Sequence, residues 1–432
     1  MARPDVQPSS GTRSPAHRLR RRAWPLAVTA VVVGSGMAFC LLWGEVVRHH
    51  NYWVYPGDIW GAYRSAHYIG WGAFGSIYAV GTGLVTFPGI LLLFTPCAML
   101  TGHLGLTESF PFYVPHPTSW LVLGPYEMLL GCSVLFACDA LAERLGVGPR
   151  RRALLCVAQG IVVWPLLAIW GHPEDAVATA LALYALGCAL DDRWTRAGWL
   201  FGAAVATQPL VLLALPVLLA RAGSQRALGM VLRAVLPSVG LLAVPLATEF
   251  HLTVHALVDQ PNFPGIDHVT PWTPLAPHLG GHGSDATVAA GPGRLVALAG
   301  AAALGWLARR WRDRPAQLVW ALALALALRC LTESVMVAFY VWPCLAVALV
   351  VAAAHRGRAR SVLAVVAAAG VTVCAQSHLG EWPWWLLVNG GLLITMLAGT
   401  SARRSSSVHE AVPIPDSAAG DQGVPAPRPA MV

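Results

Sequence analysis

The chain has 432 residues, of which 56% are apolar and only 12% are charged, and it carries a formal charge of +8. A soluble domain has about a quarter charged residues, so too few charges remain here to cover a water-facing surface. The composition therefore excludes a soluble globular enzyme, a disordered chain and a secreted disulfide scaffold. It favours an all-α protein that crosses a membrane several times.

The two ends of the chain differ from its apolar middle. Residues 1–23 are polar and end in a cluster of arginines, and the apolar run 24–43 that follows is long enough to span a bilayer. No small-x-small cleavage site precedes the next polar loop, so the run predicts a first transmembrane helix. We expect 1–23 to be a basic cytoplasmic tail and 24–400 to be the transmembrane domain. The segment 401–432 is rich in Ser, Pro and Ala and predicts a disordered cytoplasmic tail.

Nine further apolar runs each approach the roughly 20 residues that cross the hydrocarbon core. They are 119–141, 153–170, 175–190, 227–248, 292–308, 316–332, 335–354, 361–378 and 382–400. Arginine clusters separate many of them, at 144–152, 193–196, 221–226, 309–314, 356–360 and 403–404. If every cluster lies in the cytoplasm, as the positive-inside rule directs, the chain makes ten full crossings with both termini in the cytoplasm. The basic charge then belongs to cytoplasmic loops and does not indicate nucleic-acid binding.

Two apolar stretches do not fit as single crossings. The stretch 84–102 contains two prolines, and the stretch 197–220 is interrupted at Pro209. Proline removes a backbone hydrogen bond and clashes with the preceding turn, so we expect broken or re-entrant helices at both places. An ordinary kinked span at 197–220 is the alternative, and it would place Arg221 on the outer side.

Histidines and acids test this topology, because the arginines alone define it. Twelve of the fifteen histidines fall outside: His49, His50, His67, His103, His116, His172, His251, His255, His268, His278, His282 and His378. Acids fall on the same face, among them Asp58, Glu174, Asp175, Glu249, Asp259, Asp267, Asp285, Glu333 and Glu381. We therefore expect the chemistry on the extracytoplasmic side.

The first outer loop, about 44–83, is long and aromatic, and it contains the acid Asp58 directly after a Pro-Gly pair. Surrounding rings would exclude water from this carboxylate, which makes it a stronger proton acceptor and suits it to act as a catalytic base. Turn capping is the competing interpretation for Asp58, and anchoring at lipid headgroups is the competing one for the Trp and Tyr residues. Arg64 and His67 in the same loop are candidate substrate-binding residues.

The second outer turn, 171–175, reads Gly-His-Pro-Glu-Asp. Proline suits the first helical position, and acids suit the first turn, where the helix dipole favours negative charge. A helix start therefore explains Glu174 and Asp175 but not His172. The functional interpretation places His172, Glu174 or Asp175 at the floor of an outward-facing cavity, and all three are candidate substrate-binding residues.

Charged and polar residues inside later apolar runs are further candidates for substrate binding. Arg329 and Glu333 lie four residues apart near the outer end of one run. Charges inside a span are candidates for function, although these two could simply pair with each other. Arg329 or Arg64 could hold a phosphate through charge-assisted hydrogen bonds. Gln208, beside the predicted break, is expected to satisfy freed backbone groups or to reach the cavity floor.

Four segments together resemble the glycosyltransferase-C superfamily, and most of all its actinobacterial mannosyltransferase-like branch. They are Tyr55-Pro56-Gly57-Asp58, Gly171-His172-Pro173-Glu174-Asp175, Ala206-Thr207-Gln208-Pro209 and Phe339-Tyr340-Val341-Trp342-Pro343. The resemblance covers about 24–400 and implies that Asp58 is the catalytic base. Many relatives carry a pair of acids in that loop, whereas Asp58 has no acidic neighbour. A divalent metal is therefore possible but is not supported by a clear motif, and no cofactor is expected.

The resemblance implies an enzyme that moves a sugar, with mannose expected, from a polyprenyl-phosphate donor to a hydroxyl of an extracytoplasmic glycolipid or glycan. Its partners would be that donor, that acceptor and the lipid bilayer, with no nucleic acid. It would be a multi-pass plasma-membrane protein whose active face is extracytoplasmic. The rival interpretation is a transporter or lipid flippase, which also uses broken helices, but the chain has no convincing internal repeat.

Overall fold

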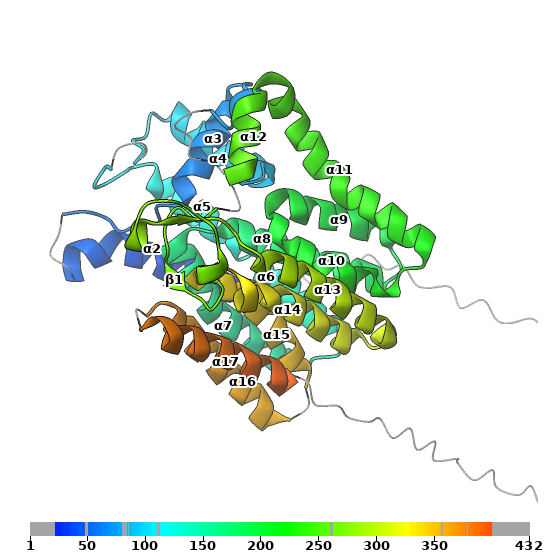
Figure 1. Ribbon diagram of the computed structural model, residues 1–432. Helices are drawn as coiled ribbons and strands as arrows, with labels where there is room; N and C mark the ends of the chain where they lie inside the picture. The colour runs from blue at the N-terminus through cyan, green and yellow to red at the C-terminus, as the bar shows by residue number, and fades with distance from the viewer. Residues whose placement is uncertain are drawn as a thin grey trace, which may run out of the picture. The chain divides into compact units, whose positions relative to one another are not determined.

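The computed structural model describes residues 22–47, 51–79, 84, 86–109, 113–259, 262–355, 357–377 and 379–399. The two predicted tails therefore lie outside the described residues, except for the end of the first, and so do His49, His50 and His378. Helices make up most of what is described (Figure 1). The prediction of an all-α fold is confirmed.

The helices follow the predicted apolar runs in chain order. They are α2 Ala23–Leu42, α3 Ile59–Gly70, α4 Gly89–His103, α5 Trp120–Gly131, α6 Ser133–Arg144, α7 Pro149–Pro165, α8 Pro173–Leu190, α9 Trp194–Thr207, α10 Leu215–Leu218, α11 Ser224–Thr248, α12 Phe250–Asp259, α13 Gly293–Ala308, α14 Pro315–Thr332, α15 Trp342–Ala354, α16 Arg358–Ala375 and α17 Glu381–Gly399. The short strands are β1 His268–Val269, β2 His278–Gly280, β3 Thr287–Val288 and β4 Val335–Met336. β1 pairs antiparallel with β4, and β2 pairs antiparallel with β3.

Within the described residues, eight helical segments are long and apolar enough to cross a bilayer. They are Ala23–Val46, Trp120–Arg144, Pro149–Trp170, Pro173–Leu190, Ser224–Thr248, Pro315–Thr332, Arg358–Ala375 and Trp382–Gly399. Shorter apolar helices occupy Gly89–His103, Pro209–Arg221 and Ala338–Ala354. These helices confirm the prediction of a membrane protein with several spanning helices.

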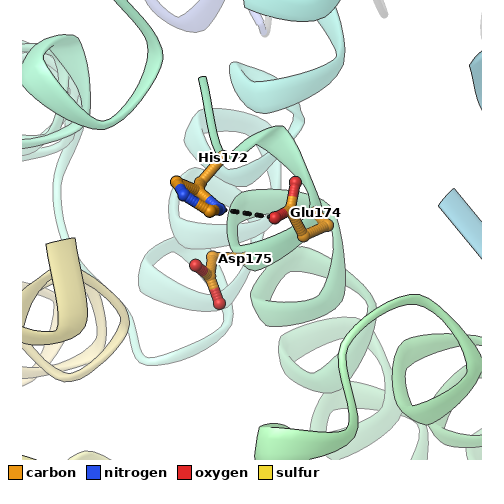
Figure 2. A group of neighbouring side chains, drawn as sticks. All are labelled: His172, Glu174 and Asp175. Atoms are coloured by element: carbon orange, nitrogen blue, oxygen red, sulfur yellow. Dashed lines mark hydrogen bonds and ion pairs between the residues drawn. The ribbon is translucent and has the colours of Figure 1, made fainter. Parts of the chain in front are cut away.

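Helix α8 lies in the interior of the bundle. It is built largely from alanine and leucine. Of its most apolar stretch of 18 residues, 78% is buried inside the protein, whereas the corresponding share for α11 is 17%. Other helices therefore enclose α8, whereas α11 turns most of its apolar surface outward, as a lipid-facing helix does. Pro173 begins α8, and Glu174 and Asp175 occupy its first turn (Figure 2). The interior helix thus carries the predicted acids at its first turn.

Buried ion pairs hold the turn between α6 and α7. Arg152 reaches Asp139 through two contacts of 2.7 Å each, and Arg22 binds the same carboxylate. Only 1% of Asp139 is exposed, and a buried carboxylate of this kind needs such partners because burial removes its hydration. The first arginine of the bundle and the α6–α7 turn are therefore fixed at the same end.

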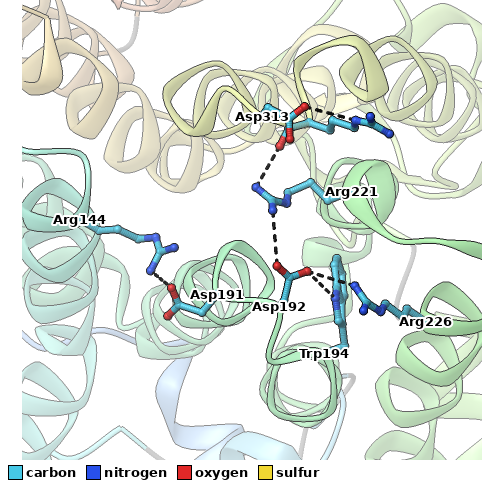
Figure 3. A network of polar contacts seen from close by, with 8 residues as sticks. Arg144, Asp191, Asp192, Trp194, Arg221, Arg226 and Asp313 are labelled. Carbon is cyan, nitrogen blue, oxygen red and sulfur yellow. Dashed lines mark hydrogen bonds and ion pairs between the residues drawn. The ribbon is translucent and has the colours of Figure 1, made fainter. Parts of the chain in front are cut away.

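A second network joins the α8–α9 turn to the same end (Figure 3). Arg144, at the end of α6, binds Asp191. Asp192 lies 3.2 Å from Arg226 and 3.8 Å from Arg221, measured between side-chain nitrogen and oxygen atoms. We call this part of the bundle, where the α6–α7 turn meets the α8–α9 turn, the arginine end.

Segment 194–221 leaves the arginine end and returns to it. Helix α9 starts beside Asp192 and stops before Gln208, which is extended with φ −147° and ψ 105°. A tighter 3-10 turn then begins at Pro209, and Arg221 at the end of the segment contacts Asp192 again. The predicted break is confirmed, and the segment is a helical hairpin in place of one continuous helix.

The prediction of a broken helix within 84–102 is wrong, because α4 occupies most of this stretch. This helix runs unbroken from Gly89 to His103 with Pro96 inside it. One proline costs a helix one backbone hydrogen bond, and packing against other helices holds the remaining turns. A Cβ on Gly89 would lie 2.5 Å from the carbonyl oxygen of Ala206, so α4 begins against the tip of the hairpin. The segment is short, not broken.

The longer loops meet at the other end of α8, which we call the loop end. Strand β1, in the loop that follows α12, pairs with β4, which follows α14. The indole of Trp170, after α7, donates a 2.9 Å hydrogen bond to Gln376, after α16. These contacts bring the first loop, the α12–α13 loop and the turns before α8, α15 and α17 onto one face.

Because segment 194–221 is a hairpin, we expect a membrane-impermeant reagent to reach both of its ends from the same side of the membrane. We expect Ala222→Cys and Arg150→Cys to react with a membrane-impermeant maleimide from that side, and His282→Cys to react from the other. The measurement uses a background in which the two half-buried native thiols, Cys188 and Cys374, are replaced by alanine. Labelling of Ala222→Cys from the same side as His282→Cys would instead show a single crossing.

Candidate functional site

His172 lies at the centre of the polar cluster at the loop end. Its Nδ1 is 2.6 Å from Glu174 Oε1, and its Nε2 is 3.1 Å from Asp58 Oδ2. Figure 2 shows the histidine beside Glu174, with Asp175 near both on the first turn of α8. The structure therefore brings together the two motifs that the sequence singled out separately, across 114 positions of the chain.

A glycine permits this contact between the first loop and the turn before α8. Gly171 has a φ of +67°, in the left-handed region that favours glycine. A Cβ at this position would lie 2.5 Å from the Cβ of Pro56. Because Asp58 follows Pro56 by two residues, the close approach at Gly171 is what places its carboxylate against His172.

The two carboxylates keep His172 charged. Burial by itself would lower the pKa of His172, but the charges and hydrogen bonds of Glu174 and Asp58 outweigh burial and raise that pKa to about 10. At neutral pH the ring is therefore an imidazolium that donates from both nitrogens. Phe339 stacks on one face of the ring, with 3.9 Å between the ring centroids. The imidazolium is thus fixed on both edges and on one face.

This protonation state bears on metal binding. Ligand atoms of His172, Glu174 and Asp175 lie within 4.8 Å of one another, close enough to share a divalent cation. A metal requires a neutral imidazole with a free lone pair. Both ring nitrogens here face carboxylate oxygens, so a metal would have to displace a proton and one of these contacts. In this arrangement the imidazole is paired with Glu174 and Asp58, and a divalent cation would replace these contacts.

Asp58 is accessible, contrary to the expectation that rings enclose it. Its side chain is 60% exposed. The aromatic rings of the first loop pack on one another instead: Trp60 is 3% exposed, 5.7 Å from Tyr55 and 6.4 Å from Trp120 between ring centroids. Asp58 precedes α3 at its N-cap position but makes no side-chain cap bond, so helix capping does not explain it either. It is an open carboxylate held in place by a histidine.

A second group lies deeper, along α8. The side chain of Gln208, at the hairpin break, interacts with Asp175, and Arg329 interacts electrostatically with the same carboxyl group. The guanidinium carbon of Arg329 lies 3.2 Å from the centre of the Tyr340 ring, a cation–π contact. The structure thus brings Asp175, Gln208 and Arg329 together.

Buried polar atoms near this group lack a hydrogen-bond partner among the described residues. They are Asp175 Oδ2, Gln208 Oε1, Arg329 Nε, Glu127 Oε1 and Glu127 Oε2. Glu127, on α5, is completely buried and interacts electrostatically with Glu174 and His172. Unpaired buried polar atoms are costly, and native proteins retain few of them. They mark a polar interior suited to water or to the polar part of a substrate.

Glu333 belongs to a neighbouring ion pair. Its Oε1 lies 2.6 Å from Nε of Arg294, at the start of α13. The alternative that Glu333 and Arg329 pair with each other is therefore wrong. Helix α14 ends just before Glu333, so helical spacing no longer governs its direction, and the side chain meets α13 instead.

Two candidates of the first loop lie on α3. His67 is buried, with its Nε2 2.9 Å from Glu108 Oε1, and so forms a separate pair away from His172. Arg64 is half-buried six residues after Asp58, about 9 Å further along the helix axis by helical rise. The structure therefore groups His67 with Glu108, and not with the polar cluster of His172.

Three further residues contact the site or its neighbouring ion pair. Glu127 carried a signal in the sequence, because a lone acid inside an apolar span is a candidate for function by default, but the sequence did not decide between lining a cavity and bonding a neighbouring helix. Arg294 was identifiable as one of the few arginines outside the cytoplasmic clusters. Phe339 lies in one of the four segments that carry the family resemblance, but nothing in that segment indicated that its ring stacks on His172.

No protein-family model matches this chain, and no curated protein matches it either. The candidate site therefore stands on the geometry of its own residues.

The charged state of His172 predicts a pH dependence of stability. The pKa of a histidine in an unfolded chain is about 6.5, and that of His172 in the fold is about 10. The stabilisation from its carboxylate partners is complete below the first value and is lost as the pH rises through the second. We expect the Tm of the wild type to fall across this range more steeply than that of His172→Gln. An exposed histidine provides the control, His255→Gln, and parallel curves for all three proteins would contradict the assignment.

Proposed function

We propose that this protein is a membrane glycosyltransferase. It transfers a sugar, with mannose the first candidate, from a polyprenyl-phosphate donor to a hydroxyl of an extracytoplasmic glycolipid or glycan. One observation carries the proposal: Asp58 is an accessible carboxylate on the first loop, held 3.1 Å from a histidine that Glu174 fixes from the other side. A carboxylate held in this way is equipped to take a proton from an acceptor hydroxyl.

The proposed topology has ten crossings, with the arginine end in the cytoplasm. The crossings are α2, α5 with α6, α7, α8, α11, α13, α14, α15, α16 and α17. The 194–221 hairpin and α4 do not cross. The positive-inside rule supports this orientation, because the ion-pair networks collect the arginines of several loops at one end. Both termini then lie in the cytoplasm of a plasma-membrane protein, and the loop end faces outward.

In the proposed reaction the acceptor oxygen attacks the anomeric carbon as Asp58 takes its proton. The bond between that carbon and the phosphate oxygen breaks, and the electron pair leaves with the polyprenyl phosphate. The configuration at the carbon inverts, because the attacking oxygen and the leaving phosphate lie on opposite faces. The site faces away from the cytoplasmic nucleotides, so the reaction uses a lipid-linked donor.

Cations near the site would offset the charge of the leaving phosphate. Arg329 forms no direct ion pair with any described residue, and its guanidinium is held against Tyr340. Arg64, on α3, is the second candidate. His172 and Glu174 act as positioning residues, because Glu174 fixes the ring of His172 and the ring holds the Asp58 carboxylate in place until an acceptor arrives.

Removing the base tests the proposal. In nanodiscs supplied with polyprenyl-phosphate mannose and a panel of glycolipid acceptors, we expect Asp58→Asn to lower kcat by about 100-fold or more, because an amide cannot accept the proton. Glu249→Gln, an exposed acid between α11 and α12, is the matched control and should keep wild-type turnover.

Two outcomes would contradict the proposal. Full turnover by Asp58→Asn would remove the assigned base. A wild-type protein that moves labelled lipid across a liposome membrane, and leaves every acceptor unmodified, would instead be a flippase or transporter.

A further inference from the structure

The loop between α12 and α13 lines a pocket at the loop end, apart from the His172 cluster. The pocket has a volume of about 670 Å³, and its lining includes Asp267, His268, His278, His282 and Leu379. Three of the fifteen histidines of the chain therefore face one cavity. None of these residues takes part in the reaction proposed for Asp58.

One wall of this pocket is rigid. His268 is 8% exposed, and its ring stacks on Trp384 with 3.7 Å between centroids. Its Nδ1 lies 2.9 Å from the Asp267 carboxylate, and its Nε2 lies 3.2 Å from the carbonyl oxygen of Ser377. Both ring nitrogens are engaged, so this wall is formed before any ligand arrives, which lowers the entropic cost of binding.

The other side of the pocket offers open hydrogen-bonding groups. His278 and His282 are exposed, and their rings make no hydrogen bond to the residues that the structure describes. Gly281 and Gly283, with φ values of +72° and +64°, flank His282. Because glycine has no side chain, the backbone on each side of His282 is not covered. A neutral imidazole supplies one donor and one acceptor. This side can therefore pair with groups that both donate and accept.

The lining selects against small ions. Within the described residues, the only group of three His, Cys or acidic ligand atoms within 4.8 Å of one another is the His172 group, so this pocket does not converge on a metal. Asp267 supplies a carboxylate that repels anions, and no arginine is among the lining residues to offset it. Ile266, Val269 and Leu379 add apolar surface between the polar groups.

We propose that this pocket binds a neutral carbohydrate of oligosaccharide size. Hydroxyls both donate and accept hydrogen bonds, as open imidazoles and a carboxylate require, and the CH faces of a sugar ring match the apolar lining. The volume lies within the range of about 300–1,000 Å³ of small-molecule sites. The chemistry of the lining thus points to a polyhydroxylated ligand without charge.

The position of the pocket makes it an acceptor subsite, an assignment that rests on the proposed glycosyl transfer. In the β1–β4 pair, His268 lies opposite Met336. Phe339, three residues further along, stacks on His172. One short segment thus links the wall of the pocket to the His172 cluster, so a sugar chain held in the pocket would lie beside that cluster.

Ligand binding tests the pocket without turnover. Free mannotriose is titrated into the full-length protein in nanodiscs and followed by saturation-transfer NMR, with trigalacturonate as the charged comparison. We expect mannotriose to bind more tightly than trigalacturonate. The double variant His278→Ala/His282→Ala should weaken mannotriose binding about tenfold, which corresponds to one or two hydrogen bonds lost. His255→Ala, an exposed histidine on α12, is the matched control.

The outcomes separate the pocket from the reaction. Unchanged binding by the double variant, or tighter binding of trigalacturonate, would overturn the pocket assignment.

Asp58→Asn should bind mannotriose as the wild type does and yet fail to turn over. A wild-type protein that binds mannotriose through these histidines but transfers no sugar would refute the glycosyltransferase and leave the pocket standing. A lipid whose headgroup is mannotriose is then added as a competitor. Displacement of free mannotriose by this lipid would show that the pocket accepts the lipid-linked form, and no displacement would show that it prefers the free glycan.

Discussion

A single half-buried cation, the imidazolium of His172, ties the first loop to the interior of the bundle. Removing this charge from water is costly, and only the two carboxylates that flank the ring offset the cost. Glu174 comes from the same turn, but Asp58 comes from a different loop. The fold must therefore bring that loop to α8 if the histidine is to stay charged, and Gly171 supplies the clearance.

The same cost of burying charge explains why so much of the architecture was predictable. Arginines cannot remain in hydrocarbon, so their clusters mark the ends of apolar runs, and the structure collects Arg144, Arg152 and Arg226 at one end. Pro209 marked the hairpin break for an equally local reason. The break predicted within 84–102 failed because Pro96 alone cannot end a helix that its neighbours support.

The site was less predictable, because its contacts join distant parts of the chain. The sequence indicated His172 and Asp58 separately, but nothing in either motif says that they touch. Glu333 illustrates the limit: its spacing from Arg329 suggested a pair, yet its partner is Arg294, 39 positions away. The pocket lined by His268, His278 and His282 depends on how a loop with little regular structure folds back on α17. No periodic pattern in the sequence predicts the path of such a loop.

The hairpin at 194–221 has a consequence for biogenesis. In the proposed topology it enters and leaves on the same side of the membrane, so it does not change the direction of the crossings that follow it. Helices α11 to α17 can acquire their orientation during insertion whether or not the hairpin has yet settled among α8, α4 and α13. Gln208 can therefore be delivered to the polar interior late, after the surrounding helices have assembled, so that its amide need not sit unsatisfied in lipid while they do so.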